Sequence, residues 1–329
     1  MSSRVVSIQN AGGPEVLELI ERAAPELLPG HVLVRVAAAG LNRADVLQRK
    51  GLYPAPKGVP SDVPGLEFSG SIEAVAPDVS GWEPGVRVMG IVGGGAMATH
   101  VVVPASELLR TPEALSDVEA AAVPEAFVTA WDALKQGRVA AGETVLLHAV
   151  ASGVGTAALQ LVRLHGATGV GTSRSPEKLS RCEALGLHRG LLVGSDARFA
   201  AEVTADLIID TIGAAYLTEN LKALAPQGRI VCLGTLGGHR GELPLGLFMS
   251  KRATLIGSVL RSRSAEEKSA IAAAFTLEVL PHFTARGTSA PLLRPVLGHV
   301  LPMHRIRDAH ALMESDTTFG KIVLTWENT

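Results

Sequence analysis

Hydrophobic and polar positions change their pattern near residue 120. Up to about residue 123, apolar runs are short and β-rich, and glycine and proline interrupt them. His31–Ala38, Gly70–Val75, Arg87–Val92 and Thr99–Val103 are such runs. Short apolar runs separated by glycine and proline predict a strand-rich, barrel-like unit rather than layered helices.

Beyond residue 125, a helical segment at Ala126–Lys135 precedes regular alternation of strands and helices. The expected strands are Thr144–His148, Thr168–Thr172, Leu207–Asp210, Arg229–Leu233 and Thr254–Ser258. The expected helices between them are Gly155–His165, Pro176–Leu185 and Tyr216–Leu224. Such βαβ units predict a doubly wound parallel sheet with helices on both faces.

The C-terminal tail is interpreted as returning to complete the first domain. It holds expected helices at Ala265–Phe283 and Ile306–Met313 and a last strand at Lys321–Trp326. We therefore predict an α/β protein of two domains. The first comprises residues 1–124 with 289–329, and the second comprises residues 125–288.

Composition narrows the class of protein. Of the 329 residues, 47% are hydrophobic and 19% are charged, which predicts an ordered protein with a substantial core. The net charge of −2 and the lack of a basic block disfavour nucleic-acid partners. Cys182 and Cys232 form no Cys-x-x-Cys pair, which argues against a disulfide framework or a cysteine-rich zinc site.

Neither a secretory leader nor a membrane span is expected. Residues 1–20 lack the basic start, apolar centre and small-residue cleavage site of a signal peptide. The uncharged run Thr144–Val162 contains Ser152, Gly153, Gly155 and Gln160, so it fits a strand, a turn and a helix better than a membrane span. We expect a cytoplasmic protein.

The strongest motif is a phosphate-binding turn within Val145–Ala158. An apolar strand enters Ser152-Gly153-Val154-Gly155, and an alanine-rich helix follows. The glycines allow a tight turn and close backbone approach, and Ala158 stands where the dinucleotide fingerprint has a third small residue. The helix start offers free N–H groups to a pyrophosphate.

Residues after the second strand of this region indicate which nucleotide binds. NAD-binding units usually have an acid there, about 20 residues beyond the turn. Here Ser173, Arg174 and Lys178 follow instead, with Ser175 as a further donor. These side chains suit a 2′-phosphate, so NADPH is favoured over NADH. The alternative is a solvated helix start. Gly213 and Gly234, which follow later strands, are further cofactor-binding candidates.

Several stretches resemble the zinc-free quinone oxidoreductase class of medium-chain dehydrogenases/reductases, across nearly the whole chain. They are Gly40–Tyr53, Pro64–Gly70, Ala121–Glu125 and Ser152–Gly155. Val259–Arg263 and Phe275–Phe283 are similar to a narrower branch, the NADPH quinone oxidoreductases induced by a tumour-suppressor transcription factor.

The resemblance implies a GroES-like β-rich catalytic domain and a Rossmann domain, with NADPH and substrate in the cleft between them. It also implies a homodimer that pairs through Thr254–Ser258. In the family, the residues that match Asn42 and Thr129 lie near the nicotinamide, and those that match Asp45 and Tyr53 lie near the substrate.

The residues that match Ser152 and Val154 lie under the pyrophosphate. The residue that matches Lys178 lies near the 2′-phosphate.

Two departures from relatives are visible. Leu66 replaces the histidine of the Gly-His-Glu motif in zinc alcohol dehydrogenases, and Glu67 alone binds no zinc, so no metal is expected. Val193 stands where related enzymes often have a tyrosine near the adenosine phosphate. Arg174, where relatives often have glycine, is our hypothesis for a compensating contact.

Each candidate residue also has a purely structural interpretation. Asn42 and Asp45 suit the cap and first turn of a helix. Tyr53 precedes a proline-rich loop and can serve in packing alone, and Thr129 can be an ordinary helix-face residue. Asp210 suits either the adenosine ribose or a cap.

The sequence therefore predicts NADPH-dependent, metal-free reduction of a quinone, with Asn42 and Tyr53 orienting the acceptor. The alternative enzyme is a reductase of enals, enones or enoyl thioesters, with Tyr53 as a candidate proton donor. The non-enzymatic alternative is a nucleotide-regulated RNA-binding module, which the near-neutral charge disfavours.

Overall fold

The computed structural model describes residues 1–194, 196–285 and 290–326. The chain divides into two compact units, Met1–Val128 with Arg261–Thr329, and Thr129–Leu260. The second predicted domain boundary, between residues 288 and 289, lies outside the described residues.

The first unit is rich in strands, which are interrupted by short helices. Its strands are β1 (Ser2–Ile8), β2 (Leu17–Ala23), β3 (His31–Leu41), β4 (Glu67–Val75), β5 (Arg87–Ile91), β6 (His100–Pro104), β7 (Leu109–Arg110), β14 (Leu297–Pro302) and β15 (Lys321–Thr325). Its helices are α1 (Arg43–Arg49), α2 (Asp117–Ala120), α8 (Ala265–Glu278) and α9 (Ile306–Glu314), and a π-helical turn covers Pro124–Val128.

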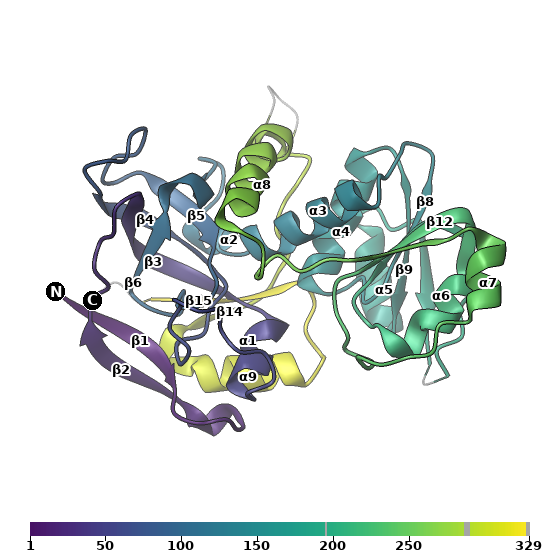
Figure 1. Ribbon diagram of the computed structural model, residues 1–329, viewed down its shortest axis with the longest axis horizontal. Helices are drawn as coiled ribbons and strands as arrows, with labels where there is room; N and C mark the ends of the chain where they lie inside the picture. The colour runs from purple at the N-terminus through teal and green to yellow at the C-terminus, as the bar shows by residue number, and fades with distance from the viewer. Residues whose placement is uncertain (195, 286–289, 327–329) are drawn as a thin grey trace. The chain divides into compact units, whose positions relative to one another are not determined.

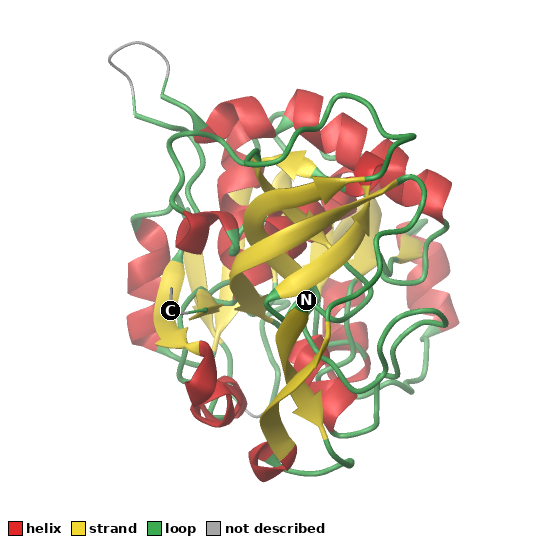
Figure 2. Ribbon diagram, turned by 90° about the vertical axis from the view of Figure 1, so that its left-hand side faces the viewer, coloured by secondary structure: helices red, strands yellow, loops and turns green. Residues whose placement is uncertain are grey.

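Strands from both ends of the chain share one sheet in this unit. The order is β14-β15-β3-β4-β5-β7, and β6 also pairs with β3. The strands curve in Figure 2, where they are yellow. Val32, Val34, Phe68 and Val88 lie in a core formed by this sheet. Strand β15 pairs with β3 so that Ile322 is opposite Leu41, which brings Lys321 to the start of α1.

The second unit is built on a parallel sheet. Its strands are β8 (Thr144–Leu147), β9 (Thr168–Ser173), β10 (Arg189–Leu192), β11 (Ala205–Asp210), β12 (Leu224–Cys232) and β13 (Thr254–Gly257). Its helices are α3 (Thr129–Gln136), α4 (Gly153–Leu164), α5 (Pro176–Glu183), α6 (Leu217–Ala223) and α7 (Leu245–Lys251) (Figure 1).

The strand order of this sheet is β10-β9-β8-β11-β12-β13, and every pairing is parallel. This is the order of a dinucleotide-binding fold, with the chain reversing direction across the sheet between β8 and β11. The turns that follow β8 and β11 therefore lie at the topological switch point, where such sheets bind ligands.

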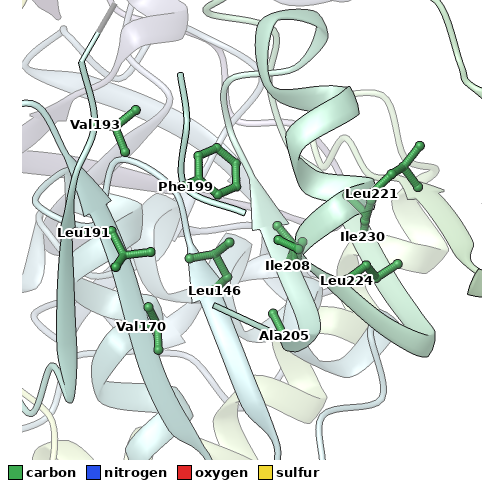
Figure 3. Packing of buried hydrophobic residues seen from close by; sticks show 11 residues of the cluster. Leu146, Val170, Leu191, Val193, Phe199, Ala205, Ile208, Leu221, Leu224 and Ile230 are labelled. Carbon is green, nitrogen blue, oxygen red and sulfur yellow. The ribbon is translucent and has the colours of Figure 1, made fainter. Parts of the chain in front are cut away.

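Apolar side chains on one face of this sheet form a continuous core. Figure 3 shows Leu146, Val170, Leu191 and Ile208 on neighbouring strands. Val193 belongs to the same core and is 2% exposed. Because its side chain is buried there, it offers nothing to a nucleotide on the surface.

The predicted α/β class is confirmed, with a β-rich unit and a doubly wound parallel-sheet unit. Local details differ from expectation. The expected helix at Ala126–Lys135 begins as a π-helical turn. The expected helix Ala265–Phe283 ends at Glu278, because Pro281 has no N–H to continue it, and a 3₁₀ turn follows at Leu280–Phe283. Among the described residues, no helix is long and apolar enough to cross a membrane.

Candidate active site

The predicted phosphate-binding turn lies between β8 and α4. Ser152 caps α4, and its Oγ accepts the N–H of Gly155 at 3.0 Å. A side chain at Gly155 has no room, since a Cβ there would lie 2.5 Å from the carbonyl oxygen of Ala149. The N–H groups of Gly153 and Val154 remain at the positive end of the α4 dipole, which suits a pyrophosphate.

The predicted 2′-phosphate residues gather at the end of β9. Ser173 Oγ accepts the N–H of Ser175 at 3.1 Å, and Ser175 Oγ accepts the N–H of Lys178 at 3.2 Å. These bonds shape the turn so that α5 starts at Pro176, with Ser175 as its N-cap. Arg174 itself is exposed, and Lys178 is partly buried.

Tyr216 is a residue that sequence reasoning missed at this end of the sheet. Its ring packs on His148 and Phe199, with centroid distances of 4.8 and 5.3 Å. Burial raises the pKa of the Tyr216 phenol, and the nearby Arg174 guanidinium opposes that rise. Tyr216 thus places an aromatic ring and a hydroxyl beside Arg174.

The turn after β11 brings the two later glycine candidates together. Asp210 Oδ1 accepts the N–H groups of Ile212 and Gly213, at 2.7 and 3.0 Å. Gly213 has φ +82°, and a Cβ there would lie 3.1 Å from the carbonyl oxygen of Gly234. Asp210 is buried and also accepts a bond from Asn220, so it serves as the cap of this turn.

Thr129 begins α3 with a buried hydroxyl that has no hydrogen-bond partner among the described residues. A buried hydroxyl without a partner is costly and is uncommon in folded proteins. A polar ligand group such as a carboxamide would satisfy it. This orphaned hydroxyl fits the predicted contact with a nicotinamide.

In the first unit, Asn42 belongs to a buried ionic cluster at the start of α1. Its Nδ2 donates to Glu67 Oε1 at 2.9 Å, and its Oδ1 accepts from Lys321 Nζ at 2.6 Å. Lys321 also forms an ion pair with Glu67. Both charged residues are buried, so the pair compensates two charges that have little access to water.

Asp45 is completely buried beside this cluster. Its Oδ1 accepts the N–H of Gly65 at 2.8 Å, and its Oδ2 accepts the N–H of Asn42 at 2.8 Å. Burial raises the pKa of Asp45 to about 6 despite these bonds. With both oxygens engaged, Asp45 holds the Asn42 turn and the Gly65 loop together.

Tyr53 stands next to Arg261, which sequence reasoning did not select. The Arg261 guanidinium lies 4.7 Å from the Tyr53 ring centroid. It donates to the carbonyl oxygen of Gly93 at 2.7 Å and to Gln48 Oε1 at 2.8 Å. Arg261 therefore holds the loop of Tyr53 and the loop of Gly93 to the end of α1.

Glu125, like Glu67, is an acidic residue of this cluster that the sequence did not indicate as a site residue. It lies in the π-helical turn, and such turns are frequent at functional sites. Its backbone N–H donates to Glu67 Oε2 at 2.8 Å. Burial, and then the charge of Glu67, raise the pKa of Glu125 to about 8.

The missed residues had weak signals in the sequence. Glu67 follows Leu66 in place of a zinc-binding histidine and so showed no ligand pattern, and Lys321 begins a strand in which the apolar run Ile322–Leu324 follows. Arg261 and Glu125 stand within stretches that carried the family resemblance, but nothing in the spacing indicated their side-chain contacts. A charged residue inside an otherwise apolar segment was the signal that could have found Lys321.

The side chains of the first unit that could serve as metal ligands do not fit a zinc ion. Among the described residues, no group of three or more histidine, cysteine, aspartate or glutamate side chains is placed to hold a metal. Leu66 is apolar, and the Lys321 ammonium already supplies a cation to Asn42 and Glu67.

Two known families match this chain, one within the first unit and one that covers most of the second unit and continues into α8 of the first. Residues 28–113 match the family described as alcohol dehydrogenase GroES-like domain. Residues 153–276 match the family described as zinc-binding dehydrogenase. The β-rich unit and the parallel-sheet unit thus define a medium-chain dehydrogenase/reductase.

Individual relatives show which members of the medium-chain dehydrogenase/reductase family this chain is similar to. The chain is 30% identical to the human protein named quinone oxidoreductase, over 98% of this chain and 97% of that protein. It is similar to the solved CurK enoyl reductase, with a TM-score of 0.86, 25% identity and coverage of 99% of both chains. A mycobacterial protein, Rv1454c, solved with NADPH, has a TM-score of 0.85 and 26% identity, over 98% of this chain and 99% of that one.

This chain belongs to the quinone oxidoreductase class of the medium-chain dehydrogenase/reductase family. It is an oxidoreductase of that family, and a nicotinamide cofactor follows from the family and from the phosphate-binding turn.

Proposed function

We propose that the protein is an NADPH-dependent reductase of quinone-type acceptors that uses no metal. The observation that carries this proposal is the capped turn Ser152–Gly155 at the switch point, followed by Arg174 and Lys178 after β9. The human relative named quinone oxidoreductase supports the choice of acceptor. When bound, NADPH supplies a hydride from its nicotinamide.

The residues of the second unit would hold this cofactor. The N–H groups of Gly153 and Val154 suit the pyrophosphate, and Thr129 offers a hydroxyl to the nicotinamide. Arg174 and Lys178, with Ser173 beside them, suit the 2′-phosphate, because a guanidinium and an ammonium both pair with phosphate oxygens. Gly213 and Gly234 leave room for the backbone turns next to them.

The residues of the first unit would act on the acceptor. The Asn42 amide is fixed by Glu67 and Lys321, so it cannot rotate freely. Tyr53 is held by the stacked guanidinium of Arg261. Side chains locked in this way orient an acceptor and hydrogen-bond the negative charge that develops on its oxygen.

A second candidate function is reduction of an activated carbon–carbon double bond. It is supported by the similarity to CurK enoyl reductase and by the acids Tyr53 and Glu125, which are proton donors of the kind that such a reaction needs. An RNA-binding role receives no comparable support, since the net charge is −2.

The test compares two cofactors and two acceptors. We expect faster oxidation of NADPH than of NADH, and faster turnover with an ortho-quinone than with a small enone. A large preference for the enone would replace the first function by the second. Tight RNA binding that NADPH blocks, without turnover of either acceptor, would contradict both.

We also propose that the protein is a cytoplasmic homodimer. Strand β13 is the last strand of its sheet, and Leu255 on it is 42% exposed. An edge strand with apolar side chains suits pairing with a second copy of the same strand.

A further inference from the structure

Three acidic side chains of the first unit lie around the same buried cluster, and their hydrogen bonds differ. Asp45 accepts bonds with both oxygens, from Gly65 and Asn42. Glu67 accepts from Asn42, Lys321 and the backbone of Glu125. The Glu125 carboxyl makes no hydrogen bond to any described side chain or backbone group, so it can meet a ligand.

Charged groups face Glu125 from several elements. Glu67 on β4 and Asp45 on α1 oppose its ionisation, and Lys321 on β15 and Arg261 favour it. Tyr53 also lies within electrostatic reach of Glu125. The carboxyl therefore shares its surroundings with Tyr53, which we propose to orient the acceptor, and with Arg261, which holds Tyr53.

We propose that Glu125 donates the proton that the acceptor takes up after hydride transfer. This inference rests on the proposed reductase function and deepens it, because it assigns the proton to Glu125 rather than to Tyr53. At neutral pH Glu125 carries the proton, since burial and Glu67 raise its pKa to about 8. Tyr53 is the weaker acid, because burial raises the pKa of its phenol further.

The proton and electron balance is complete. The bound cofactor would supply two electrons and one hydrogen as hydride, and an enone that takes them at its β-carbon becomes an enolate. The O–H bond of Glu125 breaks, and its proton forms a C–H bond at the α-carbon of the enolate. With a quinone, the proton goes to the oxyanion. Glu125 is left as a carboxylate beside Lys321 and Arg261, and water returns the proton.

Glu125→Gln keeps the size of the side chain and removes the acid. With an α-substituted enone, we expect kcat to fall by about 100-fold or more, the usual contribution of a positioned general acid. The fall with an ortho-quinone should be smaller, since solvent protonates an oxyanion readily. The wild-type rate with the enone should decline as pH rises through about 8, and the variant should lack this decline.

Stereochemistry separates a donor from a merely structural residue. In D₂O, the wild type should place deuterium on one face of the α-carbon, and Glu125→Gln should give both configurations because solvent then supplies the deuteron. Glu125→Asp keeps an acid, so it should restore a single configuration, and it serves if the Gln variant does not fold. Glu83→Gln, an exposed glutamate of the same unit, is the matched control.

Unfolding measurements test the protonation of Glu125 without turnover. The pKa of Glu125 in the folded protein lies above its ordinary value of 4.5, so the folded state loses stability as pH rises from 4.5 to about 8. Glu125→Gln avoids this loss, and its stability relative to wild type should increase across that range. If the difference in unfolding free energy between Glu125→Gln and the wild type does not change with pH, Glu125 is not protonated in the folded protein at neutral pH.

The outcomes distinguish the donor role from the function. If the wild type reduces an acceptor and Glu125→Gln keeps both the pH profile and the single configuration, the donor role is wrong and the reductase function stands. If the wild type reduces neither quinone nor enone, the proposed function fails and the donor role fails with it.

Discussion

Arg174 gives a direct test of cofactor choice at the scale of one residue. It is exposed at the start of the turn before α5 and lies near Tyr216. We expect Arg174→Ala to raise the KM for NADPH by about tenfold or more, the equivalent of one charge-assisted hydrogen bond. The KM for NADH should change little, because NADH has no 2′-phosphate.

Steady-state kinetics with both cofactors measure this difference. Arg198→Ala removes another exposed arginine from the same unit and should change neither KM. Equal increases for NADPH and NADH after Arg174→Ala would show that Arg174 does not read the 2′-phosphate.

Arg261 gives a second test, on the acceptor side. Its guanidinium uses separate nitrogen atoms for Gly93 and Gln48 and stacks on Tyr53. Lysine keeps the charge but cannot reproduce this planar arrangement. We expect Arg261→Lys to raise the KM for the acceptor several-fold and to leave the Kd for NADPH unchanged.

Arg110→Lys is the control for Arg261→Lys. Arg110 also stacks on an aromatic ring, that of Trp82 at 4.6 Å, and donates to a glycine carbonyl, that of Gly81. Its replacement should leave acceptor kinetics unchanged. If both variants alter the KM equally, the effect comes from a general loss of stacking and not from the position of Tyr53.

At the scale of elements, hydrophobic periodicity predicted the parallel sheet and each of its strands except β10, on which only Leu191 is buried. Strands such as β8 and β11 are buried on both faces and therefore read as apolar runs. The pattern missed β1 and β2, which form a separate two-stranded sheet with one exposed face. It also missed α7, on which Leu245 and Met249 are exposed and so follow no core pattern.

The candidate site was predictable only where chemistry follows from local sequence. The Ser152–Gly155 turn depends on neighbouring residues, so its strand, turn and helix were visible. The contact of Lys321 with Asn42 depends on β15 pairing with β3, which brings together residues far apart in the chain. Periodicity carries no information on such pairing, so the ionic cluster required the structure.

The edge position of β13 leads to a prediction on assembly. Leu255→Asp should shift the protein from dimer to monomer, because a buried unpaired charge at an interface is costly. Leu192, on β10 at the opposite edge of the sheet, is 57% exposed. Because Leu192 lies at the edge away from β13, Leu192→Asp should leave the dimer intact. Light scattering of both variants measures this, and a dimer that survives Leu255→Asp would place the interface elsewhere.

At the scale of the whole molecule, buried ionisable groups make stability depend on pH in opposite directions. Asp45 and Glu125 have raised pKa values, so each contributes stability at low pH that is lost as pH rises. His310 behaves in the opposite way, since burial and the adjacent Arg49 lower its pKa to about 3. The first unit should therefore be most stable at an intermediate pH.

Substitution of His310 allows the loss of stability at low pH to be measured separately from the effects of Asp45 and Glu125. Its Nδ1 lies 3.2 Å from Nη1 of Arg49, which is completely buried and also pairs with Glu314. Protonation of His310 in the folded state would place a second cation against Arg49. The unfolded chain has no such restriction and takes up the proton near the ordinary pKa of 6.5. The contribution of His310 to stability should therefore fall as pH falls from 6.5 towards 3, by up to about 1.4 kcal/mol per pH unit, against the opposite contributions of Asp45 and Glu125.

Asparagine at this position keeps an acceptor for Arg49 and cannot be protonated. We expect His310→Asn to be less stable than wild type at neutral pH, where packing is lost, and to close that gap as pH falls below about 6. Urea unfolding at several pH values measures the difference. His299→Asn, at an exposed position of the same unit, should follow the wild-type dependence. A gap that stays constant with pH would mean that the folded protein binds the His310 proton as readily as the unfolded chain does.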